Sequence, residues 1–310
     1  MRGICKYFPG VRALHKVDFT LCEGEIHALM GENGAGKSTL IKVLTGVYEK
    51  DEGEIFLKGL DKPAVIHSPQ DAQNLGISTV YQEITLCPNL TVAENMYIGR
   101  TKGMGQNWKK MNRDADKILK SLGIPAEATQ QLSSCSIAVQ QMVAIARAVD
   151  MECKVLILDE PTSSLDDNEV EKLFGLMRDL KAKGVGIIFV THFLDQVYEV
   201  CDKITVLRDG QLVGEYEIEN LPRVQLVAKM LGKELDDMSE IRDESLVYHG
   251  SDESEYIIEA EGLQSDAGIK PFNFHIKKGE VNGFAGLLGS GRSECVRAIF
   301  GADHVTAGSV

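Results

Sequence analysis

Long apolar runs and a secretion leader are both missing from this sequence of 310 residues. No run of eighteen apolar residues occurs, so no segment has the length of a membrane-spanning helix. The first residues also lack the basic head and apolar core of a signal peptide. We therefore expect a cytosolic protein. Because 44% of the residues are hydrophobic, the chain can form two globular domains of ordinary size.

Paired cysteines and an excess of basic residues are missing as well. The seven cysteines form no Cys-x-x-Cys pair, which argues against a disulfide framework and against a zinc site. Lysine and arginine number 33 against 46 acidic residues, which gives a net charge of −13. Such a charge repels phosphodiester backbones, so we expect no nucleic-acid partner.

A glycine-rich stretch is the feature on which the rest of the chain depends. It fits the P-loop pattern of Gly, four residues and Gly-Lys-Ser, and it lies between a predicted strand at 25–30 and a predicted helix from about 40. Backbone N–H groups of such a loop bind phosphates. We expect Lys37 to bridge the β- and γ-phosphate oxygens of ATP and Ser38 to ligate Mg²⁺. The predicted nucleotide-binding residues of this loop are Gly31, Glu32, Asn33, Gly34, Ala35, Gly36, Lys37, Ser38 and Thr39.

Two further apolar runs are predicted to bring polar side chains to the same edge of a parallel sheet. The run at 154–158 ends in Asp159 and Glu160, the Walker B form. Asp159 is expected to hold Mg²⁺ through water, and Glu160 to take a proton from the attacking water. The run at 185–190 ends in Thr191-His192. A single histidine is usually structural, but its place at a strand end favours a contact with the γ-phosphate.

Two other positions carry weaker signals. Tyr7 and Phe8 precede Pro9-Gly10 and could offer a face on which adenine stacks, or they could be core aromatics. Gln82 leaves a β-branched strand predicted around 76–81, and from there it could reach Mg²⁺ or a water molecule.

The order of segments predicts an α/β module with two additions. Antiparallel strands are expected around 17–21 and 53–57, next to the P-loop strand. From about 91 to 151 the pattern is helical and begins with capping-box spacing from Thr91 to Glu94, which predicts an inserted helical subdomain. A hairpin is expected around Asp209-Gly210. The first module then spans 1–235, and an acidic linker spans 236–255.

The remaining segment, 256–310, repeats the beginning of the chain. Phe274 to Ser293 aligns without a gap on Phe19 to Ser38, at a constant offset of 255 residues. The second copy has Arg292 where the first has Lys37, and a planar guanidinium does not replace a compact ammonium in a phosphate loop. The sequence contains no second Walker B run. Five glycine pairs follow the same offset: Gly24 and Gly279, Gly31 and Gly286, Gly36 and Gly291, Gly46 and Gly301, Gly53 and Gly308.

A P-loop, a strand-end Gln, an Asp-Glu pair and a strand-end His, in this order with a helical insert, resemble the nucleotide-binding module of ABC ATPases. The resemblance implies a signature serine before Walker B. Counting back from Asp159 with the family spacing gives Ser136, whereas Leu132-Ser133-Ser134 looks like the motif but lies at another spacing. Ala138 and Val139 depart from the family pattern at the positions that follow.

Closer motifs are similar to those of the tandem ATP-binding subunits of bacterial importers of ribose, galactose and galactofuranose. They are Phe8-Pro9-Gly10-Val11, the stretch from Thr191 to Tyr198 and the second loop, Gly286 to Ser293. Those subunits have two complete modules, so this sequence is expected to be a fragment. The resemblance implies ATP and Mg²⁺ as ligands, and pairing of ABC modules in which Ser136 serves nucleotide on the partner module. It also implies membrane permease partners, an indirect link to a periplasmic sugar-binding protein, and a peripheral place on the cytoplasmic face of the inner membrane.

Two other functions stay open on the sequence. One is a soluble ABC-type ATPase acting on ribosomes or DNA, although such tandem proteins generally have a long basic linker. The other is a nucleotide-binding regulator without turnover. The main expectation is a subunit that hydrolyses ATP to energise monosaccharide import, with Glu160, His192 and Gln82 at the reacting phosphate.

Overall fold

The computed structural model describes residues 1–81, 86–100, 107–232, 256–286 and 290–310. The chain divides into two compact units, Met1–Met238 and Ser239–Val310, and each is described here by itself. Within the described part, no helix combines the length and apolar character needed to cross a bilayer.

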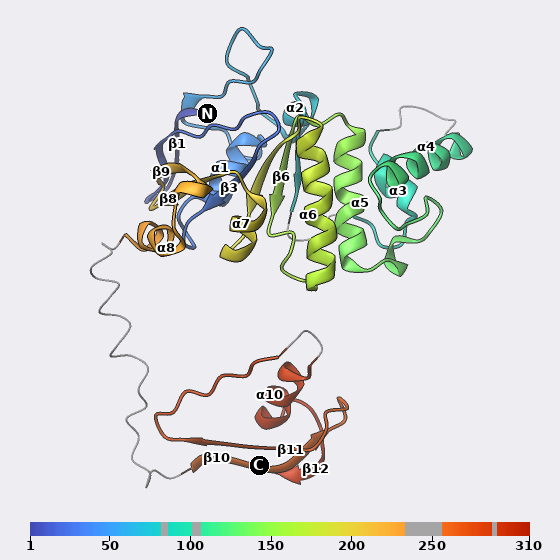
Figure 1. The fold of residues 1–310 in the computed structure, drawn as a ribbon, viewed down its shortest axis with the longest axis vertical. Helices are drawn as coiled ribbons and strands as arrows, with labels where there is room; N and C mark the ends of the chain where they lie inside the picture. Colours follow the sequence, from blue (N-terminus) through green and yellow to red (C-terminus); the bar gives the residue numbers. More distant parts are fainter. Residues whose placement is uncertain (82–85, 101–106, 233–255, 287–289) are drawn as a thin grey trace. The chain divides into compact units, whose positions relative to one another are not determined.

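The first unit is built on a six-stranded sheet of order β5-β6-β7-β3-β8-β9 (Figure 1). All neighbouring pairs are parallel except β8 and β9, which form the predicted hairpin around Asp209-Gly210. Strands β6 and β7 are therefore inner strands, as their continuous apolar runs predict. The strands are β3 (Ile26–Met30), β5 (Ile77–Val80), β6 (Val155–Asp159), β7 (Gly186–Val190), β8 (Lys203–Arg208) and β9 (Gln211–Glu217).

Alternate residues of the inner strands face two different hydrophobic clusters. Leu156 and Leu158 of β6 pack in the cluster that includes α5 (Ile137–Asp150) and α6 (Asp167–Ala182), which lie side by side over one face (Figure 1). Ile157 points to the other cluster, with residues of α1 (Lys37–Leu44). Because both faces are covered, the strand ends are the accessible parts of the sheet.

Two smaller parts complete this unit. A helical part contains α3 (Val92–Tyr97), α4 (Trp108–Ser121) and α5, and the predicted capping box is confirmed: Thr91 accepts from the N–H of Glu94, whose carboxylate accepts from the N–H of Thr91. The other helical segments are α2 (Pro69–Asn74), α7 (Leu194–Val200), α8 (Arg223–Leu231) and the short 3₁₀ turns Leu132–Ser134 and Ile218–Asn220.

The other part is a three-stranded antiparallel sheet of order β2-β1-β4, formed by β1 (Arg2–Phe8), β2 (Val11–Val17) and β4 (Glu52–Glu54). The prediction of strands at 17–21 and 53–57 was wrong in detail. Strands β1 and β2 form a hairpin that turns at Pro9-Gly10, and β2 ends at Val17. Strand β4 pairs with β1 on its other side. Phe19 is buried in the loop that follows β2, where its carbonyl accepts from the N-terminal ammonium. Its burial, and not strand pairing, explains the apolar pattern there.

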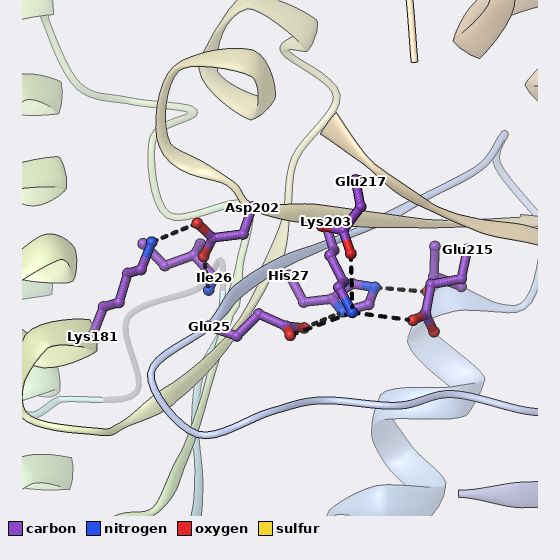
Figure 2. Close-up of polar contacts among 9 residues, drawn as sticks. Glu25, Ile26, His27, Lys181, Asp202, Lys203, Glu215 and Glu217 are labelled. Atoms are coloured by element: carbon purple, nitrogen blue, oxygen red, sulfur yellow. Dashed lines mark hydrogen bonds and ion pairs between the residues drawn. The ribbon is translucent and has the colours of Figure 1, made fainter. Parts of the chain in front are cut away.

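A buried polar cluster fixes the amino ends of the central strands (Figure 2). His27 of β3 is fully buried, with Nδ1 2.7 Å from Oε1 of Glu25 and Nε2 2.7 Å from Oγ1 of Thr205 on β8. Since an ionised carboxylate only accepts, Nδ1 carries the proton toward Glu25. Asp202 accepts from the N–H of Ile26 at 2.9 Å and from Lys181 of α6 at 2.5 Å. These contacts hold the P-loop strand against β8 and α6.

The second unit repeats part of the first. Its sheet, formed by β10 (Tyr256–Ser265), β11 (Phe272–Lys277) and β12 (Val305–Ser309), has the order β11-β10-β12, and α10 spans Arg292–Phe300. With the 255-residue offset, β10, α10 and β12 correspond to β1, α1 and β4, whereas β11 falls on 17–22, beyond β2. The counterpart of β3 forms no strand, and Val281 there is 95% exposed. In the first unit β3 lies between β7 and β8, and the described second unit has no counterpart of either.

Candidate functional site

The P-loop connects the carboxyl end of β3 to the start of α1. Gly36 caps α1 with a positive φ of 102°. A Cβ atom on Gly36 would lie 2.8 Å from the carbonyl oxygen of Ala13, and one on Gly31 would lie 2.3 Å from that of Leu207. Both positions therefore require glycine, because the loop passes directly against backbone from β2 and β8.

Lys37, the first residue of α1, folds back over this loop. Its Nζ donates to the carbonyl oxygens of Gly31 at 2.6 Å and Glu32 at 3.0 Å. Burial lowers the pKa of Lys37, and the charges of Glu160 and Asp159 oppose that effect. Lys37, Asp159 and Glu160 are therefore close enough to interact electrostatically, although the lysine comes from α1 and the two acids from the end of β6.

Asp159 is the last residue of β6 and is partly buried. Burial raises the pKa of its carboxyl, the charge of Glu160 raises it further, and Lys37 and Lys42 oppose the rise. A cation beside Asp159 would relieve this cost of ionisation. The described residues contain no cluster of three or more His, Cys, Asp and Glu able to hold a metal. The donors present, a carboxylate and the Ser38 hydroxyl, suit Mg²⁺, which takes its other ligands from phosphate and water.

The backbone of Glu160 has a conformation that residues other than glycine rarely adopt, with a φ of 49°. Its N–H donates to the carbonyl of Val190, the last residue of β7, at 2.8 Å. The backbone turns sharply after β6, and this turn lies next to the end of β7. Lys16, Glu152 and Asp209 also have a positive φ, so the conformation alone does not identify a functional position.

His192 follows β7, which lies between β3 and β6 in the sheet. Its Nδ1 lies 3.6 Å from Oε1 of Glu160, and its ring centroid lies 4.0 Å from that of Phe193. The predicted base and the predicted histidine are thus neighbours at the carboxyl edge of the sheet. The His192 side chain is 59% exposed, which leaves its ring accessible to a ligand.

Several other predicted site residues differ in how far they are exposed. Ser38 is exposed and Thr39 partly exposed at the start of α1, while Glu32 and Asn33 are exposed and Ala35 is buried in the loop. Gln82 lies outside the described residues. Phe8 is 36% exposed, with its ring edge-on to Tyr48 at 5.3 Å, so it is not a buried core aromatic.

Ser136 is the N-cap of α5 and accepts from the N–H of Val139 at 3.4 Å. It is exposed, and no hydrogen bond among the described residues joins it to the P-loop. The nearby Leu132–Ser134 forms a 3₁₀ turn and begins no α-helix. The candidate site within this unit therefore comprises the P-loop, Asp159, Glu160 and His192, and no hydrogen bond among the described residues links Ser136 to these groups.

Sequence reasoning missed one residue at this edge. Gln196 of α7 accepts from the hydroxyls of Thr162, two residues after Glu160, and Thr191, directly before His192. A glutamine within an amphipathic helix gives no signal of its own, since its partners come from the ends of two other elements.

Comparisons with known proteins bear on the fold of the first unit. Residues 14–163 match the ABC transporter family. An ATP-binding cassette of an ABC transporter, solved in its ADP conformation, superposes with a TM-score of 0.66 at 28% identity, covering 74% of this chain and 95% of that one. A dimeric cassette in a post-hydrolysis state with ADP and Pi has a TM-score of 0.60 at 26% identity, covering 70% and 97%.

The first unit thus has the fold of a P-loop ATP-binding cassette, the fold that these ABC transporter cassettes share. Among curated proteins the chain is 50% identical to the fructose import ATP-binding protein FruK of Bifidobacterium longum (strain NCC 2705), over 100% of this chain. It is also 50% identical to the galactofuranose transporter ATP-binding protein YtfR of Escherichia coli (strain K12), over 99% of the chain. The chain spans 60% and 61% of their lengths.

Proposed function

We propose that this chain binds and hydrolyses ATP to energise import of a monosaccharide through a membrane permease. The observation that carries the proposal is the convergence of Lys37, Asp159, Glu160 and His192 at one edge of one sheet. The relatives, a fructose import ATP-binding protein and a galactofuranose transporter ATP-binding protein, support the choice of substrate class.

Each residue of the group has a separate task in phosphoryl transfer. Lys37, whose Nζ now contacts two loop carbonyls, exchanges them for β- and γ-phosphate oxygens when the nucleotide enters. Glu160 takes the proton of the attacking water, and His192 donates to the γ-phosphate from the next strand. Asp159 and Ser38, with Gln82 as a further ligand, would hold Mg²⁺, which supplies neutralisation of phosphate charge.

Pairing of modules belongs to the same proposal. Ser136 lies at an exposed helix N-terminus, where backbone N–H groups and the helix dipole favour an anion. No hydrogen bond among the described residues joins it to the P-loop of its own unit, and in this proposal it serves nucleotide held by another module. Because nucleotide bound between two modules stabilises the closed pair, ATP binding drives closure and hydrolysis reverses it.

The permease would dock on the helical part of the first unit. A groove of about 180 Å³ there is lined by Leu90, Tyr97, Ile98, Trp108 and Met111, among others. Trp108 is 48% exposed and Ile98 is 41% exposed. An exposed aromatic and aliphatic pair around a groove suits an apolar helix from a membrane partner. The chain would then lie at the cytoplasmic face of the inner membrane and meet the sugar-binding protein only indirectly.

The alternative of an ATPase acting on ribosomes or DNA has less support. The net charge of −13 disfavours nucleic acid, and the relatives' names concern sugar transport.

The direct test is transport. The chain would be reconstituted with a candidate sugar permease into vesicles with ATP on the side of the cassette. Uptake of a panel of radiolabelled monosaccharides would then be measured. We expect ATP-dependent uptake of at least one sugar, abolished by Lys37→Ala. ATP-independent uptake, or no uptake of any sugar by a correctly assembled complex, would contradict the proposal.

A further inference from the structure

One amide oxygen connects the two loops that carry Glu160 and His192. Oε1 of Gln196 accepts from Oγ1 of Thr162 at 2.7 Å and from Oγ1 of Thr191 at 3.3 Å. Both threonines are almost fully buried, at 3% and 4% exposure. The glutamine comes from α7, so a third element joins the segment after β6 to the segment after β7.

The direction of these hydrogen bonds is determined by the surrounding contacts. Oγ1 of Thr191 accepts from the N–H of Phe193 at 3.1 Å, so its own proton is free to point at Gln196. Within the described part of the chain, the hydroxyl of Thr162 forms no hydrogen bond other than the one to Gln196. Removing the amide oxygen would leave two buried hydroxyl donors without an acceptor, which is costly.

The connection lies beside the reacting groups. Thr191 directly precedes His192, and Thr162 follows Glu160 by two residues across Pro161. The N–H of Glu160 also donates to Val190, so backbone and side-chain contacts together form a closed frame between the two loops. The His192 and Glu160 side chains, 3.6 Å apart and 59% and 30% exposed, project from the two segments that this frame joins.

We propose that Gln196 is a positioning residue that holds the loops of Glu160 and His192 in one geometry, so that the base and the histidine reach the γ-phosphate together. This inference rests on the proposed ATP hydrolysis. Gln196 touches no reacting atom and acts only through the two threonines. A displacement of about 1 Å at such a site can reduce the rate by about 100-fold without changing substrate affinity.

Three variants separate positioning from general stability. Gln196→Met has a similar shape and no strong acceptor, whereas Gln196→Glu keeps an oxygen that accepts from both threonines. The matched control is Asp195→Asn, the adjacent position of the same helix, which removes an exposed ion pair with Arg223. For each folded variant, phosphate release would give kcat and KM, and a fluorescent ATP analogue would give the dissociation constant.

We expect Gln196→Met to lower kcat by about tenfold or more with KM and the dissociation constant within about twofold of the wild type. Gln196→Glu should restore at least about half of the wild-type kcat, and Asp195→Asn should match the wild type. A folded Gln196→Met protein with wild-type kcat, or one whose loss lies entirely in nucleotide affinity, would overturn the inference.

A spectroscopic measurement tests the positioning independently of turnover. The chain has seven histidines, and the ring ¹⁵N signals of His192 can be assigned by comparison with His192→Ala. Glu160→Gln should shift the Nδ1 signal of His192 in the wild-type background and leave it almost unchanged in the Gln196→Met background. An equal shift in both backgrounds would show that Gln196 does not hold the pair. If the wild type hydrolyses no ATP, the proposed function fails, but this measurement still decides the role of Gln196.

Discussion

Nδ1 of His192 lies 3.6 Å from Oε1 of Glu160, although the two residues follow different strands of the sheet. Strands β6 and β7 are parallel neighbours in which Asp159 pairs with Val190. A carboxylate one residue beyond the first and an imidazole two residues beyond the second therefore meet at the same edge. In the proposed mechanism this pairing places the proton acceptor, Glu160, next to the donor to the γ-phosphate, His192.

Replacement of Glu160 by Gln removes the proposed base and keeps the side-chain shape. We expect phosphate release to fall by about 100-fold or more, because general-base catalysis of this kind contributes that much. Binding of ATP, measured by fluorescence with an ATP analogue, should stay within about threefold of the wild type. As a control, Glu169→Gln alters an acid in the first turn of α6, outside the site. Undiminished phosphate release by Glu160→Gln would refute the role of Glu160.

Replacement of Gly31 by Ala tests the close approach in the P-loop. A Cβ atom there would lie 2.3 Å from the carbonyl of Leu207, so the loop or β8 must move. We expect a loss of about 2–4 kcal/mol in unfolding free energy, from overpacking and backbone strain, and a loss of nucleotide binding. Gly59 is the matched control, since it also has a positive φ but nothing within 4 Å.

Gly59→Ala should cost no more than about 1–2 kcal/mol. Urea unfolding followed by the fluorescence of Trp108, the single tryptophan, would report on the first unit. Equal destabilisation by the two substitutions would show that the P-loop tolerates a side chain at Gly31.

The buried cluster in Figure 2 predicts a pH dependence of stability. Burial alone would raise the pKa of Glu25, but hydrogen bonds from His27 and Cys22 and the charges of His27 and Lys203 hold it below the usual 4.5. A carboxyl with a lowered pKa in the folded state stabilises the fold fully above its unfolded pKa. The contribution is lost as pH falls through the folded value.

We therefore expect the stability advantage of the wild type over Glu25→Gln to be constant above about pH 5.5 and to shrink below pH 4.5. Urea unfolding at pH steps from 7 to 3.5, again followed at Trp108, would measure it. If the stability advantage of the wild type over Glu25→Gln grew as the pH fell, the pKa of Glu25 could not be lowered in the folded state.

If the permease docks in the groove of the helical part, a substitution there should lower permease-stimulated phosphate release and leave ATP binding by the isolated chain unchanged. Trp108→Ser should weaken permease-stimulated phosphate release by about tenfold, as expected for an exposed aromatic anchor of an interface. ATP binding by the isolated chain should not change. Val224→Ser in α8 is an equally exposed apolar control, at 50% against 48% for Trp108. If both variants respond alike to the permease, the groove is not the docking site.

The parts of this structure that follow a continuous pattern could be predicted from the sequence. The apolar runs before Asp159 and His192 fixed two inner strands, and the glycine spacing fixed the turn from β3 to α1. The parts that depend on long-range packing could not be predicted. The insertion of β7 between β3 and β6, the left-handed backbone of Glu160 and the acceptor role of Gln196 arise only when distant segments meet. The apolar pattern near Phe19 misled the strand prediction because a buried loop residue carries the same signal as a strand residue.

A nucleotide titration tests whether Lys37, Asp159 and Glu160 surround one magnesium-bound triphosphate. Binding of a fluorescent ATP analogue would be measured with and without Mg²⁺ for the wild type, Lys37→Ala and Lys58→Ala, the last an exposed lysine paired with Glu23. We expect saturable, magnesium-dependent binding by the wild type and Lys58→Ala, and at least about tenfold weaker binding by Lys37→Ala, from the loss of charge-assisted hydrogen bonds. Equal binding by Lys37→Ala and the wild type, or no magnesium-dependent binding by the wild type, would contradict the account.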